Sequence, residues 1–591
     1  MELSSELENH EPASANLKIV LTKRRVIPRL SDFDGILKTF SPSERLLFYI
    51  FTAALGMSTL TLLAGVNARA SVTVPGEGGT LTEGVIGTAR FINPLLAITE
   101  PDRDLAYLVY SGLTRISPDG TIISDLASSY EISEDGTTYT FTLRQNLTFH
   151  DGTPLTAEDV LFTIRAAQNP DIKSSRRADW EGVTVATPDP KTVVFTLPRP
   201  YAPFLENTTL GILPAHVWQS VSPEEFPFTS LNTNPIGSGP FKVSKIERDK
   251  TGAAILYELT PFSRFTLGTP HLKKITMLFF SNETTLVDAW NTGHIDSFAG
   301  VSPSELSHLN GQARIIQAPL PRIFGVFFNQ GHAPVLADLA VRAALDAAID
   351  KQTLVNSILG GYAAPLKGPI PPGIFTKSED TGEESTPWNG IEEARAILER
   401  NDWEYSDEEQ VWQKDKQNLT FSLATSDSPE LSATAEALAA SWRAAGINVD
   451  IHVYPVSELN STVIRPRAYD AILFGEVVGR TLDLFAFWHS SQRNDPGLNL
   501  ALYTNSRADT TLANARATTN RKEREALYTS FTEILEEERP AIFLYAPELL
   551  YVLPETIQGV QLGTLTTPAE RFSGVYKWYT NTEQVWSILV N

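Results

Sequence analysis

The sequence predicts an α/β protein whose body is preceded by one membrane-spanning helix. From residue 336 to 545, segments with apolar residues at helical spacing alternate with short β-rich runs, a pattern typical of an α/β domain with a largely parallel sheet. Residues 46–66 form an uncharged apolar run, close in length to the roughly 20 residues that cross a bilayer. Together the two patterns indicate a folded body attached to a membrane.

The apolar run reads LLFYIFTAALGMSTLTLLAGV and follows Ser41, Pro42 and Glu44, which form a helix-start pattern. It shows no amphipathic stripe, which argues against a buried core helix. Ala68-Arg69-Ala70 fits a signal-peptidase site, so a signal peptide cleaved after Ala70 is the alternative. An uncleaved anchor is favoured, because the apolar run exceeds the roughly 7–15 residues of a typical signal and a long segment precedes it.

The charges that flank this helix predict its orientation. Basic residues are more frequent before the helix than directly after it, which places the N-terminus in the cytoplasm. Residues 1–45 are expected to form a disordered cytoplasmic tail, and the chain from about residue 67 is expected to lie outside. The predicted location is the cell membrane, in a single pass, with a periplasmic or cell-surface body.

The first part of the body carries clear local signals. Residues 138–143 alternate polar and apolar side chains, which predicts a half-buried strand, and residues 192–197 predict a second strand. Thr156 followed by Asp159 predicts an N-capped helix that runs through residue 167.

The second part supplies the helix–strand alternation on which the fold class rests. Apolar spacing predicts a helix over 336–359, closed by two glycines, and a long helical region over 508–538. The other predicted helices are 391–400 and 431–445, and the predicted strands are 449–456, 469–477 and 541–545.

The composition excludes several kinds of chemistry. Lys and Arg number 48 and Asp and Glu number 70, so the formal net charge is −22, and a chain this acidic is expected to bind no nucleic acid. Cysteine is absent, which removes disulfides, thiolate nucleophiles, cysteine-held metals and any lipid attached through cysteine.

The sequence offers no constellation of residues that favours an enzyme. The nine histidines form no H-E-x-x-H pair, and no G-x-x-x-x-G-K-S/T phosphate loop is present. Gly237-Ser238-Gly239 lacks the G-x-S-x-G spacing of a nucleophile elbow and indicates a tight turn. We therefore expect no catalytic residue, no metal and no other cofactor.

A series of motifs runs in order through the body, from about residue 78 to about 560. The motifs are Tyr110–Gly120, Asp135–Arg144, Phe149–Val160, Ile236–Phe241, Phe328-Asn329, Leu339–Leu345, Ala348–Asp350, Ala444–Val449 and Tyr469–Ala471. The series resembles solute-binding protein family 5, the extracellular peptide- and nickel-type substrate-binding proteins of ABC transporters, and in particular the dipeptide- and oligopeptide-binding proteins. The usual lipid tether of such proteins needs a cysteine, so here the apolar helix is expected to replace it.

The resemblance implies a two-lobed clamshell of the periplasmic-binding-protein type (type II) with an extra domain in one lobe. Lobe I is expected to combine residues 75–105, 231–321 and 546–591, the extra domain to span 106–230, and lobe III to span 322–545. A solute would bind between the lobes and stabilise the closed state, which ABC permease subunits then recognise. The protein is expected to be a monomer.

The resemblance leaves the solute open. A peptide is the first expectation, and a nickel chelate or an oligosaccharide bound on the same scaffold is the alternative. A non-transport role, as an envelope sensor or as a chaperone for extended chains, is a further alternative.

The loop that recognises the amino terminus of a peptide departs from the family pattern. Peptide-binding members usually carry Gly-Trp and then an Asp that pairs with the α-ammonium group, whereas here Gly475 is followed by Glu476 and the Asp position is not acidic. Glu476 or Asp483 could replace the missing charge, and Arg480 could pair with a ligand carboxylate. The alternative for all three is an ordinary surface charge.

The resemblance therefore predicts a ligand cleft at this loop. Asn93 and Pro94, after the first strand, are expected to face the loop from lobe I, and Phe327 and Phe328 are expected on a strand near the hinge. Plain core packing is the alternative for these two Phe and for Trp488. The candidate ligand-binding residues are Asn93, Pro94, Phe327, Phe328, Gly475, Glu476, Val477, Arg480, Asp483, Phe485 and Trp488.

Overall fold

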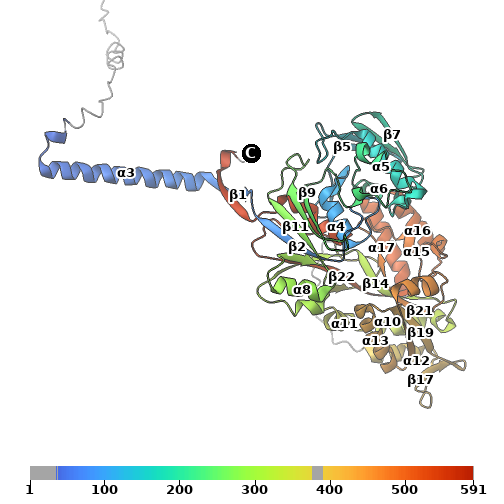
Figure 1. The fold of residues 1–591 in the computed structure, drawn as a ribbon. Coiled ribbons are helices and arrows are strands. Elements are labelled where there is room, and N and C mark those ends of the chain that lie inside the picture. The colour runs from blue at the N-terminus through green and yellow to red at the C-terminus, as the bar shows by residue number, and fades with distance from the viewer. Residues whose placement is uncertain (1–34, 36, 376–389, 590–591) are drawn as a thin grey trace, which may run out of the picture. The chain divides into compact units, whose positions relative to one another are not determined.

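The computed structural model describes residues 35, 37–375 and 390–589 (Figure 1). Most of the expected cytoplasmic tail, residues 1–45, lies outside the described residues. The chain divides into two compact units, Met1–Val74 with Glu583–Asn591, and Pro75–Thr582. The second unit has a mixed α/β fold, as the sequence predicts.

The first unit contains the apolar helix α3 (Pro42–Ala70). The backbone N–H of Ser41 donates to the Glu44 carboxylate at 2.8 Å, so the helix begins where the start pattern predicts it. None of its residues is buried, and its apolar part has a mean hydropathy of 1.9. Among the described residues it is the one helix that is long and apolar enough to cross a membrane.

A short ribbon of two strands completes the first unit. β1 (Ser71–Gly76) follows α3 directly and pairs with β23 (Asn581–Trp586), which the turn η8 (Ser587–Leu589) follows. The indole Nε1–H of Trp586 donates to Asn67 Oδ1 at 2.7 Å. The end of α3 is therefore hydrogen-bonded to a segment more than 500 residues further along the chain.

The second unit is built on a mixed sheet to which the described residues contribute twelve strands. Its order is β20-β19-β21-β14-β22-β12-β2-β11-β10-β9, and β13 and β15 both pair with β22. The strands are β2 (Thr80–Ile86), β9 (Phe241–Arg248), β10 (Ala254–Pro261), β11 (Lys274–Phe280), β12 (Ser297–Ala299), β13 (Arg314–Pro319), β14 (Arg322–Phe328), β15 (Ala363–Pro365), β19 (Thr420–Ser426), β20 (Asn448–Tyr454), β21 (Ala471–Val477) and β22 (Ala541–Leu553).

The strand β22 links the two halves of this sheet. Its first half pairs with β14 and β15, and its second half pairs with β12 and β13. The sequence predicts a strand over 541–545 alone, and the strand extends to Leu553 because these additional partners hydrogen-bond its second half. The expected lobe boundary at residue 546 falls inside this strand.

Smaller sheets surround the main one. β3 (Thr114–Ile116) pairs with β4 (Ile122–Ser124), and a three-stranded sheet contains β16 (Glu404–Ser406), β17 (Val411–Lys414) and β18 (Gln417–Asn418). A four-stranded sheet has the order β5-β6-β8-β7, with bounds β5 (Ala127–Ile132), β6 (Thr138–Leu143), β7 (Thr184–Asp189) and β8 (Thr192–Thr196). Both strands predicted in this last sheet, 138–143 and 192–197, are thus confirmed.

Several helices form where local signals predict them. The helix α5 (Ala157–Gln168) begins after Thr156, whose N–H donates to Asp159 Oδ2 at 2.8 Å. Figure 1 shows α5 and α6 beside β5 and β7. The helices are α4 (Glu100–Val109), α6 (Phe204–Asn207), α7 (Ala215–Trp218), α8 (Glu283–Asn291), α9 (Pro303–Leu306), α10 (Leu339–Ala347), α11 (Lys351–Ile358), α12 (Gly390–Arg400), α13 (Pro429–Ala444), α14 (Val456–Glu458), α15 (Phe485–Trp488), α16 (Ser506–Ala517) and α17 (Arg521–Glu538), with shorter turns between them.

The single helix predicted over 336–359 is two helices, and the helical region predicted over 508–538 also consists of two, because a capping side chain starts a new helix inside each segment. The segment 336–359 contains α10 and α11, and Asp350 caps α11 by accepting the Thr353 N–H at 3.0 Å. The segment 508–538 contains α16 and α17, and Asn520 caps α17 by accepting the Lys522 N–H at 3.0 Å. The apolar spacing continues across both breaks and hides them.

Within residues 336–545, for which the sequence predicts a largely parallel sheet, parallel pairing joins three strands. β19 is parallel to β20 and to β21, as helix–strand alternation predicts. β14 is antiparallel to both β21 and β22.

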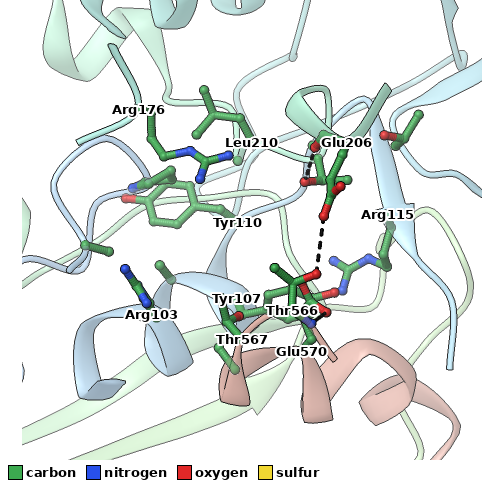
Figure 2. Close-up of a pocket in the computed structure, with 18 of the residues that line it drawn as sticks. Arg103, Tyr107, Tyr110, Arg115, Arg176, Glu206, Leu210, Thr566, Thr567 and Glu570 are labelled. Carbon is green, nitrogen blue, oxygen red and sulfur yellow. Dashed lines mark hydrogen bonds between the residues drawn. The ribbon is translucent and has the colours of Figure 1, made fainter. Parts of the chain in front are cut away.

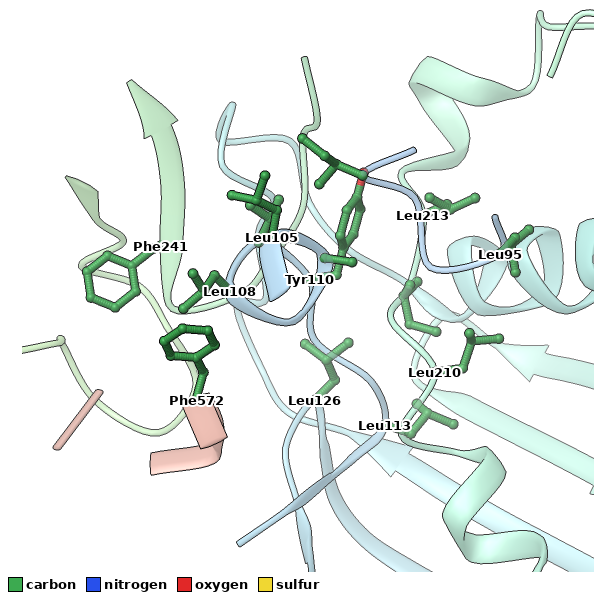
Figure 3. Packing of buried hydrophobic residues seen from close by; sticks show 14 of the residues in the cluster. Leu95, Leu105, Leu108, Tyr110, Leu113, Leu126, Leu210, Leu213, Phe241 and Phe572 are labelled. Carbon is green, nitrogen blue, oxygen red and sulfur yellow. The ribbon is translucent and has the colours of Figure 1, made fainter. Parts of the chain in front are cut away.

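The core around α4 joins segments that are distant in sequence. Leu105 and Leu108 of α4 are fully buried in a cluster that also contains Phe241 and Phe572, and Figure 3 shows these four side chains close together. Apolar burial of this kind is worth roughly 25 cal/mol per Å² and holds α4 in place.

A buried ion network reinforces the same region. The guanidinium of Arg571, on the turn η7 (Pro568–Lys577), donates to Glu83 at 2.9–3.0 Å and to both carboxylate oxygens of Asp104, at 2.8 and 2.5 Å. Tyr551 donates to the other Glu83 oxygen at 3.0 Å, and Ser297 also donates to it. All five side chains are buried. Charges can be buried here because each finds a partner of opposite sign.

Replacing Arg571 by Met should destabilise the fold, because Glu83 and Asp104 would remain buried without their counter-charge. We expect Arg571→Met to lower the free energy of unfolding by about 3–5 kcal/mol, measured by urea denaturation of the detergent-solubilised full chain. The control is Lys245→Met, which breaks an exposed ion pair and should cost less than about 1 kcal/mol. Equal losses for the two variants would contradict the prediction.

Candidate ligand-binding site

A cavity of about 280 Å³ lies in the second unit where α4, α6 and η7 meet the start of the four-stranded domain. Figure 2 shows its lining: Arg103, Tyr107 and Tyr110 come from α4 and its end, Glu206 from α6, and Glu570 from η7. Ligand sites of small solutes are typically concave and about 300–1,000 Å³ in volume. This cavity therefore has the size of a site for a small solute or for one part of a larger one.

The cavity wall contains a buried ion pair. Arg115 Nε donates to Asp125 Oδ2 at 2.8 Å, and both side chains are buried. The guanidinium of Arg115 also lies over the ring of Tyr107, 5.3 Å from its centroid. Burial raises the pKa of the Tyr107 and Tyr110 hydroxyls, so both stay protonated at neutral pH.

The loop after β21 reaches the edge of this cavity through Arg480. The guanidinium donates to Glu570 Oε2 at 2.5 Å and to the Thr564 carbonyl at 2.8 Å, and it lies 3.8 Å from Glu206 Oε1. Thr481 adds a hydrogen bond to Glu206 at 3.1 Å. Arg480, which the sequence predicts as a partner for a ligand carboxylate, is thus placed against two carboxylates that line the cavity.

Asp483 in the same loop is also engaged by the protein. Arg516 donates to Asp483 Oδ2 at 2.7 Å, and Tyr201 donates to the same oxygen at 3.4 Å. The Arg516 guanidinium stacks over Phe485, 4.5 Å from its centroid. The structure therefore brings Asp483 and Phe485 together around Arg516.

Glu476 lies at the end of β21 with its side chain inside the protein. It is 3% exposed, and neither carboxylate oxygen has a hydrogen-bond partner among the described residues. Desolvation raises its pKa well above the ordinary value. This conformation therefore favours the protonated, uncharged form of the carboxyl group.

The two residues that flank Glu476 have different surroundings from it. Gly475 packs against Phe324 so closely that an added Cβ would come within 2.7 Å of the ring. Val477 is 51% exposed and pairs with Arg322 across the strands. Position 475 therefore needs glycine for a close approach, and position 477 faces outward.

The remaining predicted residues lie in or beside the core. Phe327, Phe328 and Trp488 are fully buried, and the ring centroids of Phe327 and Trp488 are 6.0 Å apart. Asn93 is fully buried, accepts the Leu95 N–H at 2.9 Å and donates to Asn232. Their contact with a ligand stays a prediction.

Of the predicted residues, Pro94 lines the cavity itself and Arg480 contacts two of its lining residues. Sequence reasoning missed the rest of the wall, including Arg103, Tyr107 and Glu206. Tyr110 lies inside one of the family motifs, but that motif gives no indication that its hydroxyl faces a cavity. The wall forms from segments hundreds of residues apart, so no local pattern marks it.

Known proteins are similar to this chain in sequence over most of its length. Residues 121–499 match the family described as bacterial extracellular solute-binding proteins, family 5 middle. The oligopeptide-binding protein AppA of Bacillus subtilis is 25% identical over 521 residues, which cover 87% of this chain and 94% of AppA. The probable D,D-dipeptide-binding periplasmic protein DdpA of Escherichia coli is 28% identical over 502 residues, which cover 80% of this chain and 90% of DdpA.

Solved structures share the fold. NikZ from Campylobacter jejuni in complex with Ni(L-His) is 27% identical with a TM-score of 0.65, covering 85% of this chain and 99% of NikZ. AppA from Bacillus subtilis in complex with a nonapeptide is 24% identical with a TM-score of 0.64, covering 86% of this chain and all of AppA, which shows the fold alone. The predicted periplasmic-binding-protein fold is confirmed.

The burial of Glu476 predicts that the free energy of unfolding depends on pH. Because its pKa in the folded state is raised, its stabilising contribution is complete below the unfolded value and is lost as pH rises toward the folded one. Relative to Glu476→Gln, the parent should lose stability with rising pH above about 4.5, with a slope approaching about 1.4 kcal/mol per pH unit. Urea unfolding from pH 4.5 to 8 measures this, with the exposed Glu392→Gln as the control. Parallel pH profiles for the parent and Glu476→Gln would refute it.

Proposed function

This chain belongs to the bacterial extracellular solute-binding proteins of family 5, and on that premise we propose that it is a membrane-anchored receptor for an ABC import permease. It captures a solute, foremost a peptide, outside the cell membrane and delivers it to the permease. The observation that carries the proposal is the family match over residues 121–499, together with relatives named as peptide-binding proteins along most of the chain. The receptor works as a monomer.

The contacts of Arg480 support a capture mechanism by closure. The loop that follows β21 meets Glu206 on α6 and Glu570 on η7, so a few polar contacts connect parts of the second unit that belong to different proposed lobes. A solute that adds contacts in this arrangement and lacks them in an open one shifts the population toward the closed state. The closed form is then the signal that the permease subunits read.

The proposed ligand-contacting residues form two groups. The first group lies at the cavity or in the loop after β21 and comprises Pro94, Arg480, Asp483 and Phe485. The second group comprises the other proposed residues, Asn93, Phe327, Phe328, Gly475, Glu476, Val477 and Trp488.

The proposal includes the lobe bounds 75–105, 231–321 and 546–591 for lobe I, 106–230 for the extra domain and 322–545 for lobe III.

A non-peptide solute is the alternative function. The likeness to NikZ in complex with Ni(L-His), at 27% identity over nearly the whole of NikZ, favours a small chelate as the competing ligand. The two possibilities differ in the mass and metal content of the bound solute.

We expect the full-length protein, purified from its own cells in mild detergent, to carry a bound solute that native mass spectrometry releases and identifies as a peptide. The test variant is Arg480→Gln, which removes the ion pairs with Glu206 and Glu570 and should lower the fraction of protein that carries solute about tenfold. A nickel-containing or carbohydrate solute would replace the peptide proposal by the alternative, and a reproducibly empty protein would refute solute capture.

The anchor is proposed to be α3, with the N-terminus in the cytoplasm. The hydrogen bond from Trp586 to Asn67 supports retention of the helix, because cleavage after Ala70 would remove the acceptor. The absence of cysteine supports it as well, because no lipid tether through a thiol is available.

If α3 is retained, the membrane-bound protein should have the intact mass of the 65.0 kDa chain and should resist extraction by alkaline carbonate. The control is a version in which a cleavable signal peptide replaces residues 1–70, which should appear in the soluble fraction. A mature N-terminus at Ser71 in the parent would overturn the anchor.

A further inference from the structure

Donor atoms in the cavity wall lack partners. The hydroxyls of Tyr107 and Tyr110 and the Nη1 group of Arg115 are buried, line the cavity, and have no hydrogen-bond partner within the described part of the chain. Tyr110 is 3% exposed and Arg115 is 4% exposed. Buried donors of this kind are costly to leave unpaired, so the cavity is built to receive hydrogen-bond acceptors.

The carboxylates in the same wall accept hydrogen bonds from protein donors. Asp125 accepts from Arg115 at 2.8 Å and from Thr266. Glu570 accepts through Oε2 from Arg480 at 2.5 Å and from the Thr566 N–H at 2.8 Å, and Glu206 accepts from two threonines. The wall carboxylates are thus engaged by protein donors, whereas the three donors named above have no partner within the described residues.

Two further guanidinium groups stand at one end of the cavity. Figure 2 shows Arg103 and Arg176 on one side of the view, with Arg115, Glu206 and Glu570 on the other. Arg176 pairs with Asp179 at 3.0 Å, whereas no ion pair or side-chain hydrogen bond of Arg103 occurs among residues 37–375 and 390–589. Partial desolvation of the guanidinium and the neighbouring charge of Arg176 lower the pKa of Arg103, while the Glu100 carboxylate raises it, so the two guanidinium groups repel each other.

We infer that this cavity selects solutes that carry an oxyanion, a carboxylate or a phosphate, held at one end by Arg103 and Arg176, with Arg115 and the hydroxyls of Tyr107 and Tyr110 donating to further oxygens. An oxyanion relieves the repulsion between the two guanidinium groups and offers acceptors to the unpaired donors of the wall. The inference rests on the proposed solute capture and names the chemical class that the same site takes.

Four small probes test the class by isothermal titration of the full chain in detergent. Succinate and inorganic phosphate carry the oxyanion in its two forms, succinamide is the neutral counterpart of succinate, and 1,4-diaminobutane carries the opposite charge. We expect at least one of the two anions to bind at least tenfold more tightly than succinamide and 1,4-diaminobutane. The preferred anion distinguishes a carboxylate from a phosphate.

Two variants assign the binding to this cavity. Arg103→Gln removes an exposed charge and should weaken the preferred anion about tenfold, and Tyr110→Phe removes one hydroxyl and should weaken it about fivefold. The matched control is Arg165→Gln, which removes the same charge at a second cavity, beside α5, and should leave the affinity unchanged. Arg103→Lys should recover part of the loss.

The outcomes separate this inference from the proposed function. If the purified protein carries a neutral or cationic solute, or if succinamide binds as tightly as succinate, solute capture stands and the oxyanion class is overturned. If an anion binds but Arg103→Gln and Tyr110→Phe both have the parent's affinity, the assignment to this cavity is overturned. If no solute co-purifies and no probe binds, both proposals fail.

Discussion

The buried guanidinium of Arg571 is the interaction on which the site depends. It joins Glu83 on β2 to Asp104 on α4, and the turn that carries it also brings Glu570 to the cavity. Because these charges are buried and each relies on the others for hydrogen bonds, few placements of α4 and η7 satisfy all of them. Arg103 neighbours Asp104 on α4, so the network that stabilises the core also places the cavity wall.

The loop after β21 contacts this core through ion pairs and hydrogen bonds of its side chains. Arg480 meets Glu206 and Glu570 where its side chain is only 11% exposed, so these charges are mostly withdrawn from water. In such pairs the cost of desolvation offsets much of the Coulomb attraction. If the proposed opening separates them, the charges regain solvent, and the contacts of a solute can then bias the balance between the two arrangements.

The sequence predicts those parts of this structure that depend on neighbours in the chain. The cap formed by Thr156 and Asp159 sets the start of α5, and polar–apolar alternation sets β6, so both are found where expected. The new helix starts at Asp350 and Asn520 are not predicted, because the apolar spacing continues across them and a single capping residue is a weaker signal than that spacing. The family motifs lead to the correct fold, but the partners of Arg480 on α6 and η7 come from tertiary packing, which one sequence does not display.

The charge that the site presents follows from the state of its carboxylates. Glu206 and Glu570 face Arg480, and Glu476 is buried with its pKa raised by desolvation, so none of the three is an ionised, open partner for a ligand ammonium group in this conformation. Arg103 forms no ion pair or side-chain hydrogen bond within the described ranges, so the cavity offers a cation for an anionic ligand in a chain whose net charge is −22. At physiological salt the distant charges are screened beyond about 8 Å. Recognition of an anion would thus depend on donors inside the cavity, while the acidic surface gives its approach no assistance.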